Sequence, residues 1–504
     1  MGISTVVLLV AAATFALIGL SQIGRQAVDL EDYMVSRNQI GGPMALATIT
    51  ASALGAWILF SPVEAGSLFG GITAILGYCV GSAAAVFLFV FIGPRLRQIM
   101  PWGHSLNEYV RHRFGGQLGS QSGGLSAGRQ SPWGRAMYWL TVAVMLLYMF
   151  VYLTAELTAI AQTLQLVADV PLLTTCIVVI TAVFLYTTYG GLKVTILTDA
   201  LQFGLIVPLL LVCFGATITL LGGFGAAFTP VRETLPEFLS FGNIDGLRFG
   251  ATLIIAIIAA ELFNQGNWQR VYACKDDPTV RLAFLGSSLV ILPLLFLSGL
   301  LGLIAAGFEL SGTTAFFDLL QMLAVPSWLI GAVVLLAVAL VMSSLDTLLN
   351  GISAVFTIDL LRLSNRPDRV LLISRILTVA VGIPAVAIAA KGFSVLYLFF
   401  IADLICAALL FPIVFSFYNR YQTGANAFCS SLLGIAVGTL FFPKPDFTPL
   451  VTLPGAGDLL NSFAAAFLIS TIATVIWCAV DINFRHKAVK PFNYSDLKQI
   501  KPYG

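Results

Sequence analysis

Long apolar stretches, separated by short polar segments, follow one another along nearly the whole chain. A helix that crosses a bilayer needs about 20 mostly apolar residues. Thirteen stretches meet this length: 3–22, 43–62, 69–93, 136–165, 170–188, 194–222, 246–268, 282–307, 327–358, 371–390, 393–419, 424–442 and 459–481. The pattern therefore predicts an all-α polytopic membrane protein with about thirteen transmembrane helices.

Composition supports this class. Hydrophobic residues make up 58% of the 504 residues and charged residues only 10%, against about 25% charged in soluble proteins. The net charge of +2 gives no reason to expect a nucleic-acid partner. No Walker-type loop, Ser/His/Asp set or metal-like cysteine spacing is present in the sequence, so an enzyme is not expected. We expect one transmembrane domain over 1–504, with the lipid bilayer as its partner, and the sequence carries no signal for an oligomeric state.

Basic residues indicate the orientation, because Lys and Arg collect in cytoplasmic loops. With thirteen spans, most of the 26 Lys and Arg residues lie on one side of the membrane, and the other side has only Arg232, Arg248, Lys391 and Lys444. We therefore predict a plasma (inner) membrane protein with its N-terminus outside and a cytoplasmic tail over 482–504. The polar segment 94–135, rich in Gly, Ser and Gln near its end, is predicted to be a mobile cytoplasmic loop.

Two spans carry polar or small residues where a continuous helix would not need them. Span 43–62 contains Ser52-Ala53-Leu54-Gly55-Ala56 in its middle, which suits either an unwound turn or close helix packing. Span 246–268 ends in Glu261-Leu262-Phe263-Asn264-Gln265, which suits either a break or a helix end at the interface. Interrupted helices in corresponding positions of two halves indicate an inverted repeat with a central site. The halves would be 43–222 and 246–419, with 3–22 as an extra N-terminal helix and 424–481 as C-terminal helices.

Other polar residues inside apolar spans are candidates for ion or solute contacts. Ser343, Asp346 and Thr347 share one helix face, and their oxygens suit an alkali cation. Alternatively, the hydroxyls bond to carbonyls one turn earlier and Asp346 lies at a wet helix end. Asp199 follows the predicted turn at Gly190-Gly191 and suits either an ion contact or an interfacial cap. Glu156 suits either structural pairing or a solute contact.

Together these stretches resemble the sodium/solute symporter family, which includes proline, pantothenate, sugar and urea carriers. The resemblance rests on the run Tyr-Thr-Thr-Tyr-Gly-Gly-Leu-Lys to Thr-Asp-Ala-Leu-Gln at 186–202, on Met-Ser-Ser-Leu-Asp-Thr-Leu-Leu at 342–349, on Ser52 to Trp57, and on Phe263-Asn264-Gln265. It implies a leucine-transporter-type 5+5 inverted repeat and alternating access. It also implies a Na⁺ site on the carbonyls of Ala51, Leu54 and Leu340 and the hydroxyls of Ser343 and Ser344.

The same resemblance implies a second Na⁺ or a coupling role for Asp199, Asp346 and Thr347, although Asp346 stands where the two-sodium pattern has a hydroxyl. For the solute it points to Trp57, Glu156, Glu261, Asn264 and Gln265. Ile257, Ile258, Ala260 and Leu262 argue against proline or a hexose. The two glutamates favour an amide- or amine-bearing solute.

The expected function is Na⁺-coupled import of a small polar organic solute. Two alternatives remain at this stage. One is a membrane solute sensor of the same fold that signals through a partner, and the other is a passive carrier that does not depend on Na⁺.

Overall fold

The computed structural model describes residues 3–23, 30–115, 131–360, 367–446, 448–484 and 491–500. These residues are almost entirely helical, and no named strand occurs among them. The elements in chain order are α1 (Ile3–Ile23), α2 (Leu30–Met34), α3 (Gly42–Ala53), η1 (Ala56–Leu59), α4 (Ser61–Leu68), α5 (Ile72–Ile99), α6 (Leu106–Phe114), α7 (Pro132–Ala168), α8 (Leu172–Leu220), α9 (Phe224–Thr234), η2 (Pro236–Leu239), α10 (Ile244–Leu262), α11 (Gln265–Ala273), α12 (Asp277–Gly307), α13 (Ala315–Met322), α14 (Ser327–Val355), η3 (Phe356–Leu360), α15 (Pro367–Ala389), α16 (Val395–Ser416), α17 (Gly424–Phe441), α18 (Leu459–Phe484) and η4 (Tyr494–Gln499).

The predicted spans correspond to these helices. In the described part of the chain, nine helices are long and apolar enough to cross a membrane, and two bent helix pairs bring the number to eleven. One of the nine, α8, contains a break at Gly191, whose φ of 60° and ψ of −164° are not helical. A side chain there would meet Tyr33, so glycine is required. With α8 counted as two segments and α1 included, each predicted stretch has its helix.

Of the alternatives open for each of the two spans, the structure shows a break in both. The first lies between α3 and η1–α4, where Leu54 and Gly55 are extended and the helix axis bends by 55°. The second lies between α10 and α11, with a bend of 59°. Each broken helix opens a series of five spans, the first continuing through α5, α7 and the two segments of α8, and the second through α12, α14, α15 and α16. The fold is thus the 5+5 inverted repeat.

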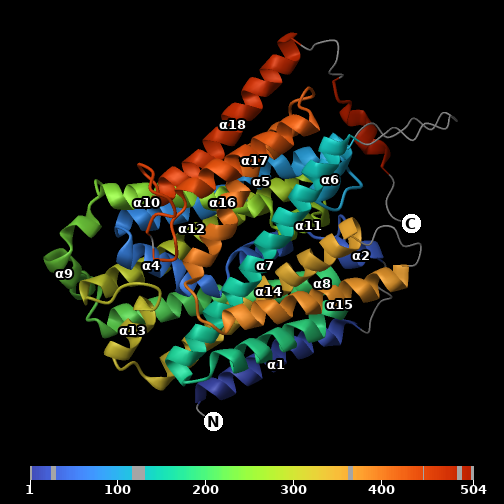
Figure 1. The fold of residues 1–504 in the computed structure, drawn as a ribbon. Helices are drawn as coiled ribbons and strands as arrows, with labels where there is room; N and C mark the ends of the chain where they lie inside the picture. Colours follow the sequence, from blue (N-terminus) through green and yellow to red (C-terminus); the bar gives the residue numbers. More distant parts are fainter. Residues whose placement is uncertain are drawn as a thin grey trace.

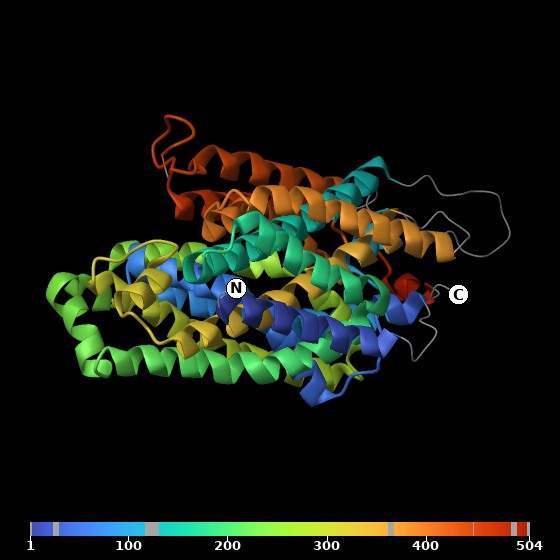
Figure 2. The same ribbon diagram turned by 90° about the horizontal axis from the view of Figure 1, so that it is seen from below.

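The helices form an elongated bundle, with α1 along one side and the pair α17–α18 along the opposite side (Figure 1). Helices α9 and α13 lie at one end of this bundle, and α2 and α6 lie at the other (Figures 1 and 2). Helix α5 packs against both α10 and α12. Gly77 on α5 faces the backbone of Gly250 on α10, and small residues of this kind let membrane helices approach closely.

The polar segment 94–135 is more ordered than predicted. Helix α5 continues to Ile99, and α6 begins after Ser105, whose hydroxyl accepts a hydrogen bond from the N–H of Glu108 at 3.0 Å. The prediction of a loop is therefore wrong for 94–99, 106–114 and 132–135, which belong to α5, α6 and α7. Buried residues such as Tyr109 hold α6 in place. Residues 116–130 of the predicted loop lie outside the described residues.

Candidate functional site

The break in the first repeat meets α14 at the predicted sodium ligands. The hydroxyl of Ser343 donates to the carbonyl of Ala51 at 2.9 Å and to that of Leu340 at 3.2 Å. Ser344 donates to Leu340 at 3.1 Å. Leu54 lies in the extended segment of the break, and its N–H donates to Ala51 at 3.2 Å. The structure thus brings these neutral oxygens of α3 and α14 together, and oxygen is the ligand that hard cations prefer.

Glu156 on α7 holds this break from the opposite side. Its Oε2 accepts a hydrogen bond of 2.8 Å from the N–H of Ala56, the first residue of η1. A carboxylate at a helix N-terminus is stabilised by the helix dipole. Its Oε1 lies where a Cβ of residue 55 would be, so Gly55 has to be a glycine. Glu156 does not line the central cavity described below. Its Oε2 contacts the backbone of η1, and its Oε1 has no hydrogen-bond partner among the described residues.

The break in the second repeat is organised around Glu261. Its carboxylate accepts hydrogen bonds from Asn267 at 2.6 Å, from Asn264 at 3.2 Å and from the hydroxyl of Tyr148 at 3.2 Å. The side chain of Asn264 also caps α11 by accepting from Gly266 at 3.0 Å. Gln265 donates at 2.8 Å to the carbonyl of His104, away from the cavity. Of the predicted solute residues, only Trp57 and Glu261 line the central cavity.

The central cavity lies between the two breaks. Its volume is about 40 Å³. Its lining residues come from α3, η1, α5, α7, α10, α12 and α16: Ala53, Trp57, Tyr78, Ser82, Val86, Tyr148, Tyr152, Leu253, Ile257, Ala260, Glu261, Ile291, Leu396, Phe399, Phe400 and Asp403.

Aromatic rings and carboxylates share the walls of this cavity. Trp57 stacks on Tyr78 with ring centroids 5.6 Å apart, and its indole N–H donates to the Tyr152 hydroxyl at 3.0 Å. Tyr152 in turn packs edge-on against Phe399 at 5.1 Å. The lining contains Glu261 and Asp403 but no Lys, Arg or His. Aromatic faces beside carboxylates are suited to organic cations.

Asp403 is the functional candidate that the sequence reasoning missed. Its side chain is only 4% exposed, and its Oδ1 has no hydrogen-bond partner among the described residues. The available signal was a single acid inside the apolar stretch 393–419, since ionisable residues within spans are usually functional. The aromatic residues Tyr78, Tyr148, Tyr152 and Phe399 were also missed, because aromatic residues in apolar helices give no such signal.

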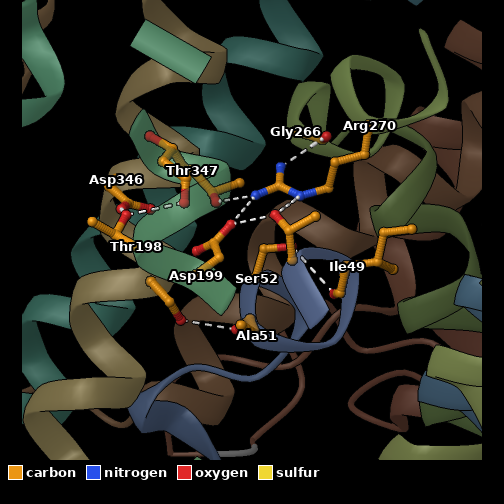
Figure 3. Close-up of polar contacts among 12 residues, drawn as sticks. Ile49, Ala51, Ser52, Thr198, Asp199, Gly266, Arg270, Asp346 and Thr347 are labelled. Atoms are coloured by element: carbon orange, nitrogen blue, oxygen red, sulfur yellow. Dashed lines mark hydrogen bonds and ion pairs between the residues drawn. The ribbon is translucent and has the colours of Figure 1, made fainter. Parts of the chain in front are cut away.

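A guanidinium occupies the centre of the second predicted cation site (Figure 3). Arg270 on α11 is fully buried and donates to Asp199 at 2.6 Å, to Thr347 at 2.7 Å and to Thr48 at 3.0 Å. Arg270 follows the predicted span 246–268, and the orientation prediction places it among the cytoplasmic loop residues; that placement is wrong, because α11 carries it into the bundle. Asp199 is fully buried as well, so the alternative of an interfacial cap is also wrong.

Asp346 lies beside this group on α14. It is fully buried, which excludes a wet helix end, and its Oδ2 accepts hydrogen bonds of 3.0 Å from both Tyr186 and Thr198. The hydroxyl of Thr347, the next residue, accepts the hydrogen bond from Arg270 described above. Among the described residues, no group of three or more His, Cys, Asp or Glu side chains is placed to hold a metal ion.

Comparison with known proteins agrees with this geometry. The model of the sodium:solute symporter family matches residues 33–434. The chain is 28% identical over 430 residues to the spermidine transporter DUR31 of Candida albicans, covering 82% of this chain and 76% of that protein. It is 22% identical over 436 residues to the urea active transporter of Saccharomyces cerevisiae, covering 78% and 56%. A solved Na⁺-coupled sialic acid symporter shares the fold, with a TM-score of 0.75, 17% identity, and coverage of 95% of this chain and 98% of the other.

Proposed function

Because the chain belongs to the sodium:solute symporter family, we propose that this multi-pass membrane transporter uses the Na⁺ gradient to import a small organic cation that carries an amino group. The observation that carries this proposal is the pair of acids in the central cavity, Glu261 and Asp403, which has no basic side chain beside it. A buried charge without a partner costs several kcal/mol. A transported ammonium group would supply the missing charge.

The chemistry of the walls supports an amine over a neutral amide. Asp403 has a free acceptor oxygen, and the aromatic residues Trp57, Tyr78 and Tyr152 line the cavity, where a ring could contact a cation. Similarity to a spermidine transporter over most of both chains points the same way, since spermidine is a polyamine. Urea, which is neutral, would leave both carboxylates uncompensated.

Sodium is proposed to bind at the carbonyls of Ala51, Leu54 and Leu340 and the hydroxyls of Ser343 and Ser344. In that position the ion would bridge α3 of the first repeat to α14 of the second. An ion that binds better to one conformation shifts the population toward it. Na⁺ would thus favour the state that accepts solute from outside, and a membrane potential of −100 mV would add about 2.3 kcal/mol per charge.

One Na⁺ per cycle is the proposed stoichiometry. Asp199 and Thr347, two of the three residues predicted to bind a second ion, already hold the guanidinium of Arg270. This resident cation would replace a second Na⁺ between the two repeats. The N-terminus is proposed to lie outside and the tail inside, as the distribution of Lys and Arg predicts.

The test is uptake of radiolabelled amines into proteoliposomes with and without an inward Na⁺ gradient. We expect Na⁺-dependent uptake of an amine that a matched amide does not compete for. Asp403→Asn should lower amine uptake at least about tenfold, the scale of a lost charge-assisted hydrogen bond, while half-saturating Na⁺ stays within about twofold. Uptake without Na⁺ would favour the passive carrier, and amine binding without any uptake would favour the sensor.

A further inference from the structure

An arginine without an acidic partner lies inside one of the membrane spans, away from the central cavity. Arg375 belongs to α15, within the stretch Val370–Ala389 that is long and apolar enough to cross a membrane. Its Nε is buried and has no hydrogen-bond partner among the described residues. None of the ion pairs in this part of the chain includes it. Ionisable residues within spans are costly and usually functional, so this guanidinium lacks an anion that would balance its charge.

Two tyrosine rings hold the guanidinium in place. Its central carbon lies 4.8 Å from the ring centroid of Tyr189 and 5.7 Å from that of Tyr33. Tyr33, on α2, is itself fixed by a hydrogen bond of 3.2 Å from its hydroxyl to the carbonyl of Thr188 on α8. Ring faces attract a cation, but they carry no net charge. The side chain is therefore positioned by neutral groups.

A small polar pocket lies beside this arginine. Its volume is about 10 Å³, and its walls come from α2, α8, α14 and α15, including Tyr33, Thr187, Asn350, Ser353 and Arg375. A space of this size holds one small ion or one water molecule, and it excludes an organic solute. Arg375 is the only charged residue in the lining, so the pocket has a net positive charge.

Two buried residues of the lining have polar atoms without partners. Thr187 and Asn350 are each 3% exposed, and neither the hydroxyl oxygen of Thr187 nor the Oδ1 of Asn350 has a hydrogen-bond partner among the described residues. The NH₂ group of Asn350 donates to the hydroxyl of Thr195. Since a hydroxyl both donates and accepts, this amide can turn end for end and free its NH₂ group for a ligand. A hydroxyl, an amide and a guanidinium are all donors that an anion accepts.

The acid closest to the pocket along α14 is engaged elsewhere. Asp346 lies one helical turn before Asn350 and does not line the pocket. Its Oδ2 accepts hydrogen bonds of 3.0 Å from Tyr186 and Thr198. A water molecule in the pocket would satisfy the donors but would leave the charge of Arg375 unbalanced, whereas an anion would do both.

We propose that this pocket is a binding site for a monatomic inorganic anion, with chloride as its physiological ligand. The anion binds to the guanidinium of Arg375, the hydroxyl of Thr187 and the amide of Asn350. It thereby joins α15 to α8 and α14, and through the contact between Arg375 and Tyr33 it also holds α2. The site is separate from the central cavity and does not depend on which solute that cavity binds.

The experiment measures thermal unfolding of the purified full-length protein in detergent while chloride replaces gluconate at constant Na⁺ and ionic strength. Gluconate is too large for the pocket. A ligand that binds the folded state raises the unfolding midpoint with its concentration, so we expect the midpoint to rise as chloride is added. Arg375→Gln should abolish this rise. Thr187→Val removes one donor at nearly constant shape and should raise the chloride concentration for the half-maximal effect at least about tenfold, the scale of a lost hydrogen bond to a charged group.

The matched control is Arg281→Gln, which removes an exposed arginine at the start of α12. It should respond to chloride as the wild type does. A wild-type midpoint that does not change with chloride would overturn the site. An unchanged chloride response in Thr187→Val, which keeps the arginine and tests the site even where Arg375→Gln fails to fold, would also overturn it. Neither result would affect the amine proposal, whose test is uptake.

Discussion

The buried pair of Arg270 and Asp199 allows a quantitative test of how the two repeats are held together. Both side chains are fully buried, and the shortest distance between their charged atoms is 2.6 Å. Replacing Arg270 by Met leaves Asp199 with the hydroxyl of Thr48 as its remaining hydrogen-bond donor. Removing one partner of a buried ion pair costs about 3–5 kcal/mol, because the other charge stays buried and unpaired. We therefore expect Arg270→Met and Asp199→Asn each to lower the free energy of unfolding by about that amount.

The double variant Arg270→Met/Asp199→Asn removes both charges and so avoids an unpaired one. We expect its loss of stability to be smaller than the sum of the single losses by at least about 2 kcal/mol, within the range measured for close charge pairs. The measurement is unfolding of the purified protein in detergent, followed by the fraction that remains folded and monodisperse. Single losses that simply add would show that the pair is not coupled, and the reasoning above would be wrong.

The same variants test the stoichiometry. If Arg270 is the resident cation, wild-type uptake should depend on Na⁺ with a Hill coefficient close to one. Arg270→Met frees Asp199 and Thr347, so any uptake that remains should show a steeper dependence on Na⁺. A wild-type coefficient near two would contradict the proposal of one Na⁺ per cycle.

Three further predictions follow from other contacts. Ser343→Ala removes one proposed Na⁺ ligand at a cost of about 1–3 kcal/mol, so half-saturating Na⁺ should rise about five- to 150-fold in uptake assays, and an unchanged value would exclude Ser343 as a ligand. Gly55→Ala places a methyl group on the carboxylate of Glu156, so uptake should be lost at normal surface expression, whereas Gly204→Ala, where the added atom meets open space, should transport normally. Burial alone would lower the pKa of His104, but the hydrogen bonds that its ring donates to the carboxylates of Glu108 and Glu31, together with their charges, raise it from 6.5 to about 9. Because the pKa of His104 is higher in the folded than in the unfolded protein, its protonation stabilises the fold. This stabilisation is complete below pH 6.5 and is lost as the pH rises through about 9. His104→Gln should therefore flatten the loss of thermal stability over that range.

The fold was largely predictable from the sequence because its signals are local. Apolar length marks a span, and the small residues around Gly55 or the polar residues after Glu261 mark a break. The pairing of two breaks then gives the repeat. The segment 106–114 was mispredicted because the polar helix α6 is held by contacts with distant elements, such as the hydrogen bond from the Tyr109 hydroxyl to the carbonyl of Ser416.

The site was less predictable because its residues acquire their roles from partners on other helices. The sequence places Arg270 a few residues beyond a break, and nothing local tells whether it reaches solvent or turns inward to Asp199, 71 positions away. Glu156 was a candidate for solute binding, but it does not line the central cavity, and one oxygen of its carboxylate accepts from the backbone of Ala56. The Oδ1 of Asp403 has no hydrogen-bond partner in the described residues, and that property, on which its proposed role rests in part, is visible only in three dimensions.

A single face of α7 connects the two breaks to the cavity between them. Tyr148, Tyr152 and Glu156 are spaced four residues apart and so point the same way. Glu156 bonds to the start of η1, Tyr152 to the indole of Trp57, and Tyr148 to Glu261 at the end of α10. A change in the angle of either broken helix has to move a residue on this face. Since the first break also carries the proposed Na⁺ ligands Ala51 and Leu54, α7 provides a direct physical connection between ion binding and the groups proposed to hold the amine.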